Sequence, residues 1–482
     1  MQRKMSQREC SFLSVTLNVD GLPIHSSTTH SFWPILCILD QSPDKQPFIV
    51  ALYYGQSKPN NAAVFLRPFV EECLRLEQNG LYVNGVKFEF RVSCIIADAP
   101  ARAFIKCIKS HNSLHACEKC QQEGVYIGRT VWPYSSELSL RTDIGFVNQE
   151  YEDHQILKSI LTELDVGLVT QVPLDFMHLV CLGVVKKMIR CWIENGPKEC
   201  KLNIRKIDEI SRRLLLCHNH YPAEFSRRPR PLKLFKYWKA TEFRAFVLYI
   251  GPVVLQKIFP NGSIYKHFMM LHCAIYILCS EDISQNDQWR SYADSLLHCF
   301  VKNSRIFYSE EFTVYNVHNL LHLAADVYNF GSLDLFSAFP FENFMSKIKR
   351  LVRSHNMPLE QVAKRLGEKS NYSLPQKTIP VKKQGGIIKK IPIFDNCVLS
   401  TCLGDSCFVT LNGDIVVIKK IKKCPKSDDY ILQCNSFLNK SDFYVEPIES
   451  SKLGIYKVSH GTNRKNYLVT VAQKVFTVTQ LL

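Results

Sequence analysis

The chain has 482 residues, of which 46% are hydrophobic and 11% aromatic, so it is too apolar for an intrinsically disordered protein. Its 60 Lys and Arg exceed its 44 Asp and Glu, and the net charge of +16 favours a polyanionic partner, with nucleic acid the economical candidate. No apolar run is long enough to span a bilayer, and residues 1–10 lack the apolar core of a signal peptide, so we expect a soluble intracellular protein.

The first 120 residues alternate strand-forming and helix-forming patterns. β-branched and aromatic runs, separated by turn signals, predict strands at 12–19, 33–39 and 48–54. Apolar residues at helical spacing predict a helix at about 62–76, and a strand pair follows at 81–83 and 86–97. The order of three strands, helix, strand and helix is that of a ribonuclease-H-like mixed α/β sheet, which we assign to residues 1–120.

The rest of the chain changes pattern three times. Helical periodicity dominates residues 121–330, which we interpret as a large all-α insertion, and residues 331–370 add a helix to the first sheet. Residues 371–393 are rich in Pro, Gly and Lys, as expected of a linker. Short strand patterns from 394 to 482 predict a small all-β domain, either a barrel or a sandwich.

Three acidic residues stand at the ends of these elements or within them. Asp20 follows the first strand, Asp98 follows the strand that ends at residue 97, and Glu342 lies in the late helical segment. If the fold gathers these carboxylates, they form a site for two divalent cations, which clamp the attacking and leaving oxygens of a phosphodiester.

Each acid also has a simpler interpretation. Asp20 could form a hairpin turn with Gly21, Asp98 could cap the helix that follows it, and Glu342 could be a solvated helix residue. Aromatic residues next to Glu342 argue against the last interpretation, because a carboxylate among them needs a cation or a hydrogen-bond donor.

Two further pairs have the spacing of metal ligands. Cys117 and Cys120 form a C-x-x-C, and His318 and His322 form an H-x-x-x-H whose spacing places both rings on one helix face. Two thiolates and two imidazoles make a closed tetrahedral zinc set. His115 could replace one ligand. With 19 Cys and no secretory signal, reduced thiols or metal ligands are more plausible than disulfides, although either pair alone is also compatible with ordinary packing.

Asp175 and His178 form a polar pair at the start of a helical segment that runs to residue 192. The simple interpretation is a helix cap followed by core residues. The alternative is a pair that orients DNA near the acids.

Five segments together resemble the catalytic region of cut-and-paste DNA transposases of the CACTA (En/Spm, CMC) superfamily. They are NVDGLPIHSSTTHSFWPILC, CIIADAPARAFIKCIKSHNSLHACEKC, PLDFMHLVCLGVVKK, WKATEFRAFVLYIGPVVL and YNVHNLLHLAADVYNFGSLDLFSAFPFEN, within about residues 10–370.

The resemblance assigns roles to the candidate residues. It implies that the three acids are the DDE triad, that the two Cys are the family's C-x-x-C, and that Asp175 and His178 are its D-x-x-H. The related vertebrate immune recombinase pairs such a C-x-x-C with two histidines before the catalytic Glu, which is the placement of His318 and His322.

The implied activity is DNA strand cleavage and strand transfer with Mg²⁺ or Mn²⁺, supported by a structural Zn²⁺. The implied partner is DNA, bound by a homo-oligomer, and the implied location is the nucleus. Phosphate contacts are expected from the basic residues Arg227, Arg228, Arg230, Lys347, Lys349, Arg350 and Arg353. Related enzymes can stack a flipped base on an aromatic ring, for which Trp192 and Trp238 are candidates.

One departure from the family favours a different class of function. The first catalytic strand begins near residue 12, so the N-terminal DNA-binding domains usual in active transposases are expected to be absent. The alternatives are a catalytically idle, host-adopted or truncated remnant that binds DNA or protein, and a zinc-stapled scaffold with no nucleic-acid role.

Overall fold

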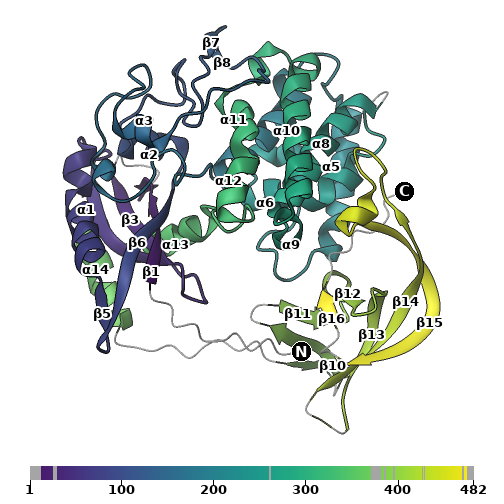
Figure 1. Cartoon of the computed structure of the whole chain (residues 1–482). Coiled ribbons are helices and arrows are strands. Elements are labelled where there is room, and N and C mark those ends of the chain that lie inside the picture. Colours follow the sequence, from purple (N-terminus) through teal and green to yellow (C-terminus); the bar gives the residue numbers. More distant parts are fainter. Residues whose placement is uncertain are drawn as a thin grey trace. The chain divides into compact units, whose positions relative to one another are not determined.

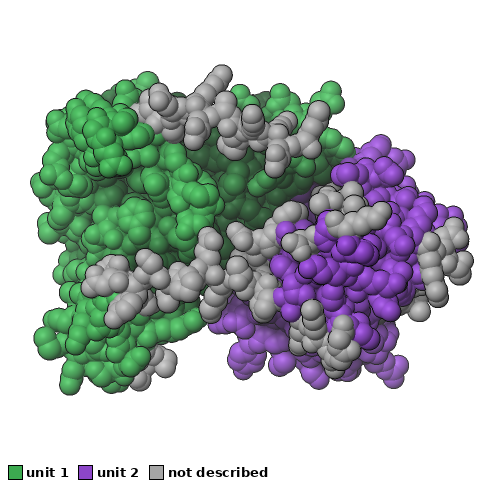
Figure 2. Space-filling view, turned by 90° about the horizontal axis from the view of Figure 1, so that it is seen from below, with its two compact units in different colours: residues 1–184, 278–373 green, residues 185–277, 374–482 purple. Residues whose placement is uncertain are grey.

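The computed structural model describes residues 12–24, 30–259, 262–370, 381–384, 387–394, 397–425, 427, 429–468 and 472–474. The first eleven residues and much of the predicted linker at 371–393 lie outside this part of the chain. The chain forms two compact units, each built from separated stretches of sequence (Figure 2). Unit 1 comprises residues 1–184 and 278–373, and unit 2 comprises residues 185–277 and 374–482.

A six-stranded mixed sheet forms the centre of unit 1 (Figure 1). Its strands are β1 (Phe12–Val19), β2 (Leu22–Pro23), β3 (Ser31–Leu39), β4 (Phe48–Gly55), β5 (Leu81–Val83) and β6 (Val86–Ile96). β1 lies between β3, to which it is antiparallel, and β6, to which it is parallel, while β4 pairs with the other side of β3.

The dipeptide Asp20-Gly21 is not the hairpin turn that its sequence could form. β1 and β2 pair with β3 in one unbroken register, since Val19 faces Ile35 and Leu22 faces Phe32. Asp20 therefore lies at an interruption within a continuous ladder. A Cβ atom on Gly21 would come within 3.1 Å of the Trp33 ring, which explains why glycine suits this position.

Helix α1 (Ala62–Asn79) covers the sheet with one apolar face. The Asn61 side chain caps its first turn by accepting from the Val64 amide, and Gly80 ends it with a positive φ of 71°. Leu66, Phe69, Val70 and Cys73 recur at helical spacing and pack into the core beneath β1, β3 and β6.

The remaining helices of unit 1 bring distant sequence to the sheet. They are α2 (Ala99–Ile105), α3 (Asp143–Val147), α9 (Glu281–Ser284), α10 (Asp287–Tyr308), α11 (Tyr315–His318), α12 (Leu323–Phe330), α13 (Phe339–Lys349) and α14 (Pro358–Ser370).

The helix predicted from 177 to 192 is built instead as a π-helix at Met177–Val185, α4 at Lys186–Arg190 and a second π-helix at Cys191–Asn195. No helix among the described residues has the length and apolar character needed to cross a bilayer.

Unit 2 combines helices with an eight-stranded sheet. The longer helices are α5 (Ile204–Leu216), α6 (Ala240–Ala245) and α8 (Ser263–Cys279). The strands are β9 (Lys382–Gln384), β10 (Ile387–Phe394), β11 (Cys397–Ser400), β12 (Cys407–Thr410), β13 (Ile415–Lys423), β14 (Tyr430–Asp442), β15 (Tyr456–Leu468) and β16 (Ala472–Lys474). The protein is thus mixed α/β, with a mixed sheet, a helical region and a C-terminal all-β part, as the sequence predicts at this level.

Helices and strands of unit 2 are joined by hydrogen bonds between distant segments. The Tyr444 hydroxyl lies 3.0 Å from His272 Nε2. The side chain of Asp405 accepts from the Ala223 amide at 2.9 Å, and Glu224 accepts from the Val398 amide at the same distance. The all-β part is therefore an integral portion of unit 2.

The aromatic core of unit 2 corrects one expectation. Trp192 is fully buried and Trp238 is 5% exposed. Both rings pack against Phe246, with ring centroids 6.5 and 5.7 Å away. They are core residues and are not accessible to stack on a flipped base.

Candidate functional site

Asp20 and Asp98 lie at the same edge of the sheet of unit 1. Asn18 on β1 pairs with Ile96 on the parallel strand β6, and each acid follows two residues later. The Asn18 side-chain amide also donates to the Ile96 carbonyl at 2.8 Å. Because parallel strands end at the same edge, the two carboxylates are brought together by pairing that no local sequence pattern reveals.

Helix α13 and the first π-helix complete a polar group at this edge. One donor atom from each of Asp20, His178 and Glu342 lies within 4.8 Å of the other two. His178 Nε2 lies 3.9 Å from a Glu342 carboxylate oxygen. The Glu342 side chain is 40% exposed, so its aromatic neighbours do not enclose it as the sequence suggests.

The buried carboxylate of Asp175 holds this arrangement. It accepts from His178 Nδ1 at 2.6 Å and from the amide of Ala338 at 2.7 Å, where α13 begins. It also caps the π-helix by accepting from the amides of Met177 and His178. Asp175 therefore fixes both the His178 ring and the helix that carries Glu342, and it is positioned to orient them rather than to meet a ligand.

The surroundings of two residues at this site, Asp20 and His178, raise their pKa values. Burial, with the charges of Asp98 and Glu342, raises the pKa of Asp20 to about 8, although His178 and the Gly21 amide act in the opposite direction. Burial alone would lower the pKa of His178, but the hydrogen bond to Asp175 and the surrounding carboxylates raise it to about 9. The folded site therefore favours the protonated forms of both His178 and Asp20.

Asp98 has a structural role in addition to its charge. Its side chain accepts from the Ala101 amide at 2.7 Å and so caps α2, as the simpler sequence interpretation predicts. It lies outside the closest group of donor atoms, but its charge acts on both Asp20 and His178. Capping and proximity to the other acids are compatible, because a carboxylate has four lone-pair sites.

A buried charge network links α2 to the C-x-x-C segment. Glu118, between the two cysteines, accepts from Arg102 Nε at 2.8 Å and from Lys106 Nζ at 2.7 Å, and all three side chains are at most 4% exposed. Arg102 also donates to the carbonyl of Ala97, the residue before Asp98, at 2.6 Å. Tyr315 donates to Glu118 at 2.8 Å. The network was not predicted, because single charged residues in a sequence give no sign of burial.

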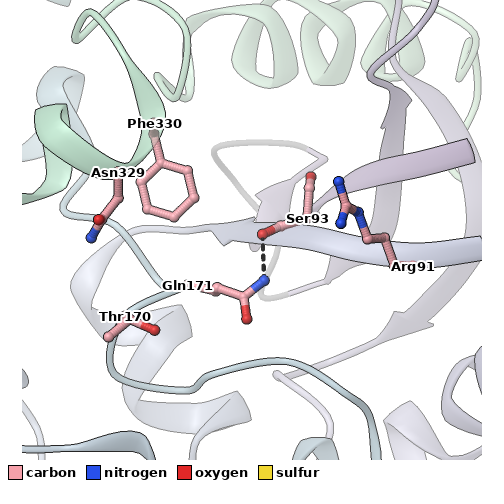
Figure 3. A pocket seen from close by; sticks show the side chains of 6 residues that line it. All are labelled: Arg91, Ser93, Thr170, Gln171, Asn329 and Phe330. Carbon is pink, nitrogen blue, oxygen red and sulfur yellow. Dashed lines mark hydrogen bonds between the residues drawn. The ribbon is translucent and has the colours of Figure 1, made fainter. Parts of the chain in front are cut away.

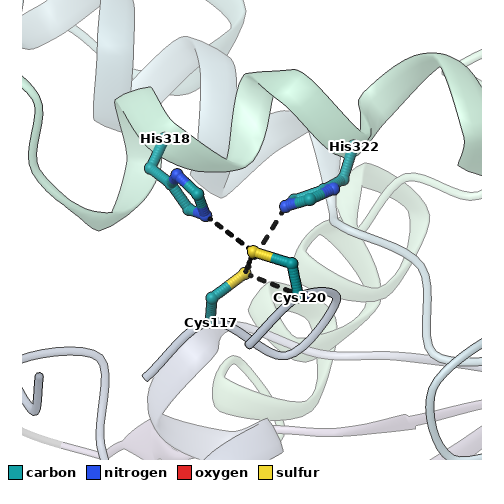
Figure 4. A group of neighbouring side chains, drawn as sticks. All are labelled: Cys117, Cys120, His318 and His322. Carbon is teal, nitrogen blue, oxygen red and sulfur yellow. Dashed lines mark hydrogen bonds between the residues drawn. The ribbon is translucent and has the colours of Figure 1, made fainter. Parts of the chain in front are cut away.

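The four predicted Cys and His ligands converge in the interior of unit 1 (Figure 4). Cys117 Sγ lies 3.5 Å from His322 Nε2, Cys120 Sγ lies 3.4 Å from His318 Nε2, and the two sulfurs are 3.5 Å apart. The sulfur separation is far beyond a disulfide bond. All four donor atoms lie within 4.8 Å of one another, so the group could hold a metal ion.

Neighbouring residues fix these ligands. Trp132 stacks on the His318 ring, with centroids 5.8 Å apart. His318 ends α11 and His322 ends a 3₁₀ turn at Asn319–His322, so the two rings converge from one helical stretch that tightens between them. His115 is not part of the group and lies against Glu123, at 3.6 Å.

The predicted DNA contacts fall in two places. Lys347, Lys349, Arg350 and Arg353 are exposed at and beyond the end of α13 in unit 1, and Lys349 donates to the Pro23 carbonyl at 2.7 Å. In unit 2, Arg230 pairs with Glu242 at 2.6 Å and Arg228 donates to the carbonyls of His218 and Tyr221, while Arg227 is exposed. Arg228 and Arg230 therefore have structural bonds in addition to any ligand contact.

Unit 1 also contains a pocket of about 580 Å³, and none of its lining residues belongs to the candidate sites (Figure 3). Its lining comes from Arg91 and Ser93 on β6, from Thr170 and Gln171, and from Asn329 and Phe330. The Gln171 amide donates to the Ser93 carbonyl at 2.8 Å, and the Arg91 guanidinium lies over the Phe12 ring. Gln171 and Arg91, two polar residues of the lining, therefore have interaction partners within the fold.

A comparison with known protein families matches only the C-terminal part of the chain. Residues 375–480 match a family model described as a domain of unknown function (DUF8592), and these residues contain the strands β9–β16 of unit 2. No curated protein matches the chain.

Proposed function

We propose that this protein is a transposase-derived polynucleotidyl transferase of the DDE type, resembling the CACTA superfamily, which cleaves and joins DNA strands. The observation that carries the proposal is that three carboxylates lie at the same edge of the sheet. Oxygens of Asp20 and Glu342 lie within 4.8 Å, and Asp98 is near enough to raise the pKa of Asp20. Repulsion among them is relieved by Mg²⁺ or Mn²⁺, which prefer oxygen ligands.

The surrounding topology supports this proposal. The strand order β4-β3-β1-β6, with β1 antiparallel to β3 and parallel to β6, agrees with a ribonuclease-H-like core. The helical segments between Asp98 and Glu342 agree with an insertion into that core.

Each residue has a proposed role in the reaction. Asp20 and Asp98 would hold the cations, and Glu342 would complete one site. When bound, the cations supply Lewis acidity to an in-line displacement in which water, and later a DNA 3′-hydroxyl, attacks phosphorus as the bond to the leaving oxygen breaks. His178, protonated and held by Asp175, presents Nε2–H beside Glu342 and would donate to a phosphate oxygen.

The Cys117, Cys120, His318 and His322 group would hold a structural Zn²⁺. Tetrahedral bonds of 2.0–2.3 Å place donor atoms roughly 3.3–3.8 Å apart. The Cys117–His322, Cys117–Cys120 and Cys120–His318 donor atoms, 3.5, 3.5 and 3.4 Å apart, agree with that range. Such a site would tie the C-x-x-C segment to α11 and the 3₁₀ turn after it.

The basic residues at the end of α13 would bind DNA phosphates beside the acids. Lys349 lies seven residues after Glu342, two helical turns or about 10 Å along the same face. A nuclear location and a homo-oligomer on DNA belong to the same proposal.

Cleavage assays test this function. The purified chain, incubated with supercoiled or linear duplex DNA and Mg²⁺ or Mn²⁺, is expected to nick or join strands. Asp98→Asn and Glu342→Gln should each reduce the rate by at least about 100-fold, a loss of roughly 2.7 kcal/mol in transition-state stabilisation. Asn caps helices about as well as Asp, so Asp98→Asn removes a ligand while keeping α2 intact.

The matched control is Asp153→Asn, which changes an exposed acid of unit 1 and should leave the rate unchanged. DNA binding without turnover under either cation would contradict the proposal and favour a catalytically idle descendant.

A further inference from the structure

The C-terminal all-β part carries a disproportionate share of the positive charge. Residues 375–480 contain 16 Lys and Arg against eight Asp and Glu, so about a fifth of the chain supplies half of its net charge of +16. Much of this charge is on β13, whose second half reads IKKIKK. Charge concentrated in one element calls for a local explanation.

Three lysines of β13 are exposed side by side. Lys419, Lys420 and Lys422 are exposed, whereas Ile418, just before them, and Ile421, between Lys420 and Lys422, are buried in the core of the sheet. A register shift between Ile418 and Lys420 adds one residue to the strand, so both Lys419 and Lys420 reach the solvent. Among the described residues, no acidic side chain forms an ion pair with any of the three lysines. We call Lys419, Lys420 and Lys422 the β13 lysine face.

The position of β13 within the sheet excludes the common explanation for exposed lysines on a strand, which is protection of a sheet edge. Exposed lysines often protect the edge of a sheet from pairing with another chain. β13 is an interior strand, paired with β14 along most of its length and with β12 and β10 on its other side. Lysine is also a poor strand former, and like charges on adjacent positions repel.

A neighbouring strand adds to the same positive potential. Ile388 of β10 pairs with Ile421, so in this antiparallel pair Lys389 lies next to Lys420. On the other side, Lys420 and Lys422 face Gln433 and Ile431 of β14, which carry no charge. The repulsion is therefore not offset within the sheet, and a polyanion would relieve it.

We propose that the β13 lysine face binds the phosphate backbone of duplex DNA, which gives the DUF8592-matched region a nucleic-acid-binding role. The identification of the polyanion as DNA rests on the proposed function. Sequence-independent binding to single strands uses aromatic side chains on which bases stack. Two aromatic residues lie on the neighbouring strands, Tyr430 opposite Lys423 and Tyr467 opposite Leu432 of β14, and both pack against the core of the sheet. Within the described part of the chain, the face thus offers charge without a stacking platform, which suits a duplex backbone.

Salt-dependent binding of the full chain tests this proposal. Anisotropy of a labelled duplex of arbitrary sequence is measured without divalent cations, from about 50 to 200 mM salt. Substituting Lys419, Lys420 and Lys422 together by Gln is expected to weaken binding at least about tenfold. It should also reduce the slope of log K against log salt by about two to three, since each neutralised phosphate contributes roughly 0.9.

Two matched variants control for charge and folding. Changing Lys198, Lys201 and Lys233 to Gln removes the same charge from exposed sites in the helical portion of unit 2 and should change the slope by less than about one. Changing the three β13 lysines to Arg keeps the charge and should bind like the parent. Comparable thermal unfolding midpoints for all variants would exclude misfolding.

Several outcomes would overturn the proposal. Parental duplex affinity in the β13 Gln variant would do so, as would an equal loss in the helical control. Loss of binding only to single-stranded DNA or to an acidic polypeptide would assign the face to another partner. The assay needs no cleavage. If the chain binds duplex DNA through this face but never nicks it, this inference holds and the catalytic proposal fails.

Discussion

The fold changes the protonation of Asp20. Burial and two neighbouring carboxylates oppose its charge and raise its pKa to about 8, whereas an unfolded Asp titrates near pH 4. Between about pH 4 and pH 8 the folded chain therefore binds the proton that the unfolded chain has lost. The contribution of this group to stability is complete below that window and falls as the pH rises through it.

We expect Asp20→Asn to remove this pH dependence, because the amide cannot ionise. In buffer without divalent cations, the variant should exceed the parent in free energy of unfolding by at least about 1 kcal/mol at pH 8, given about 1.4 kcal/mol per pKa unit, and by less at pH 5. Urea unfolding at both pH values measures the difference. Asp153→Asn is the control, and a parent–variant difference that is the same at pH 5 and pH 8 would contradict the expectation.

At the scale of elements, the C-x-x-C segment and α2 are joined by buried charges. Glu118 is the shared acceptor for Arg102, Lys106 and Tyr315. Its carboxylate has a pKa well below its usual range because those two cations outweigh the effect of burial. Through Arg102, the same network holds the carbonyl that precedes Asp98. The loop that carries the two cysteines thus helps to position one of the three acids.

Replacing Glu118 by Gln should leave two buried cations without a counter-charge. We expect a loss of about 3–5 kcal/mol in free energy of unfolding, the usual cost of breaking a buried ion pair from one side. Chemical denaturation of the zinc-loaded chain is the measurement. Glu123→Gln, five residues away and 61% exposed, should change stability by less than about 0.5 kcal/mol. A similar small change in both variants would show that the network is not stabilising.

Local elements of this chain could be predicted from sequence more fully than their pairing. The run at 12–19 is β1 and the helix expected at 62–76 is α1, extended to Asn79. These elements follow from periodicity and capping residues, which are local. By contrast, the continuous ladder through Asp20-Gly21 depends on β3; Pro23 argues locally against a hairpin turn, but it does not reveal the pairing with β3.

The candidate sites show the same division. The two Cys, the two His, Asp20 and Asp98 were singled out because each pair or strand end has a recognisable pattern, whereas Glu342 was singled out by its aromatic neighbours and by the family resemblance. The sequence placed Asp175 and His178 near the acids as only one of two interpretations, because the position of His178 next to Glu342 depends on Asp175 joining the π-helix to the start of α13. Charged residues such as Arg102 and Glu118 look solvated in the sequence, and only tertiary packing shows that they are buried.

At the scale of the whole molecule, the interleaving of sequence between the two units has no local signature. Residues 185–277 fold with residues 374–482, although almost one hundred residues of unit 1 separate them. The periodicity of a helix shows that one face is buried but does not identify what covers it. The all-β part is therefore better tested by point substitutions in the full chain than by truncation.

The contact between Tyr444 and His272 offers such a test. His272 Nδ1 donates to the Val247 carbonyl at 2.7 Å, so Nε2 accepts from the Tyr444 hydroxyl at 3.0 Å. Burial lowers the pKa of His272 to about 4, which keeps the ring neutral. The stability that depends on this neutral ring is present above the unfolded pKa of about 6.5 and is lost as the pH falls towards 4.

We expect Tyr444→Phe to lower the free energy of unfolding by about 1–2 kcal/mol at pH 7.5, because it leaves a buried acceptor without its donor. Hydrogen exchange should rise in both α8 and β14, since the lost bond joins α8 to the segment that directly follows β14, and urea unfolding gives the energy. Tyr456→Phe on β15, where the side chain is partly exposed at 38%, is the matched control and should cost less than about 0.5 kcal/mol. Faster exchange confined to β14 would mean that helices and strands of unit 2 open independently, and the view of the all-β part as an integral portion of that unit would then be wrong.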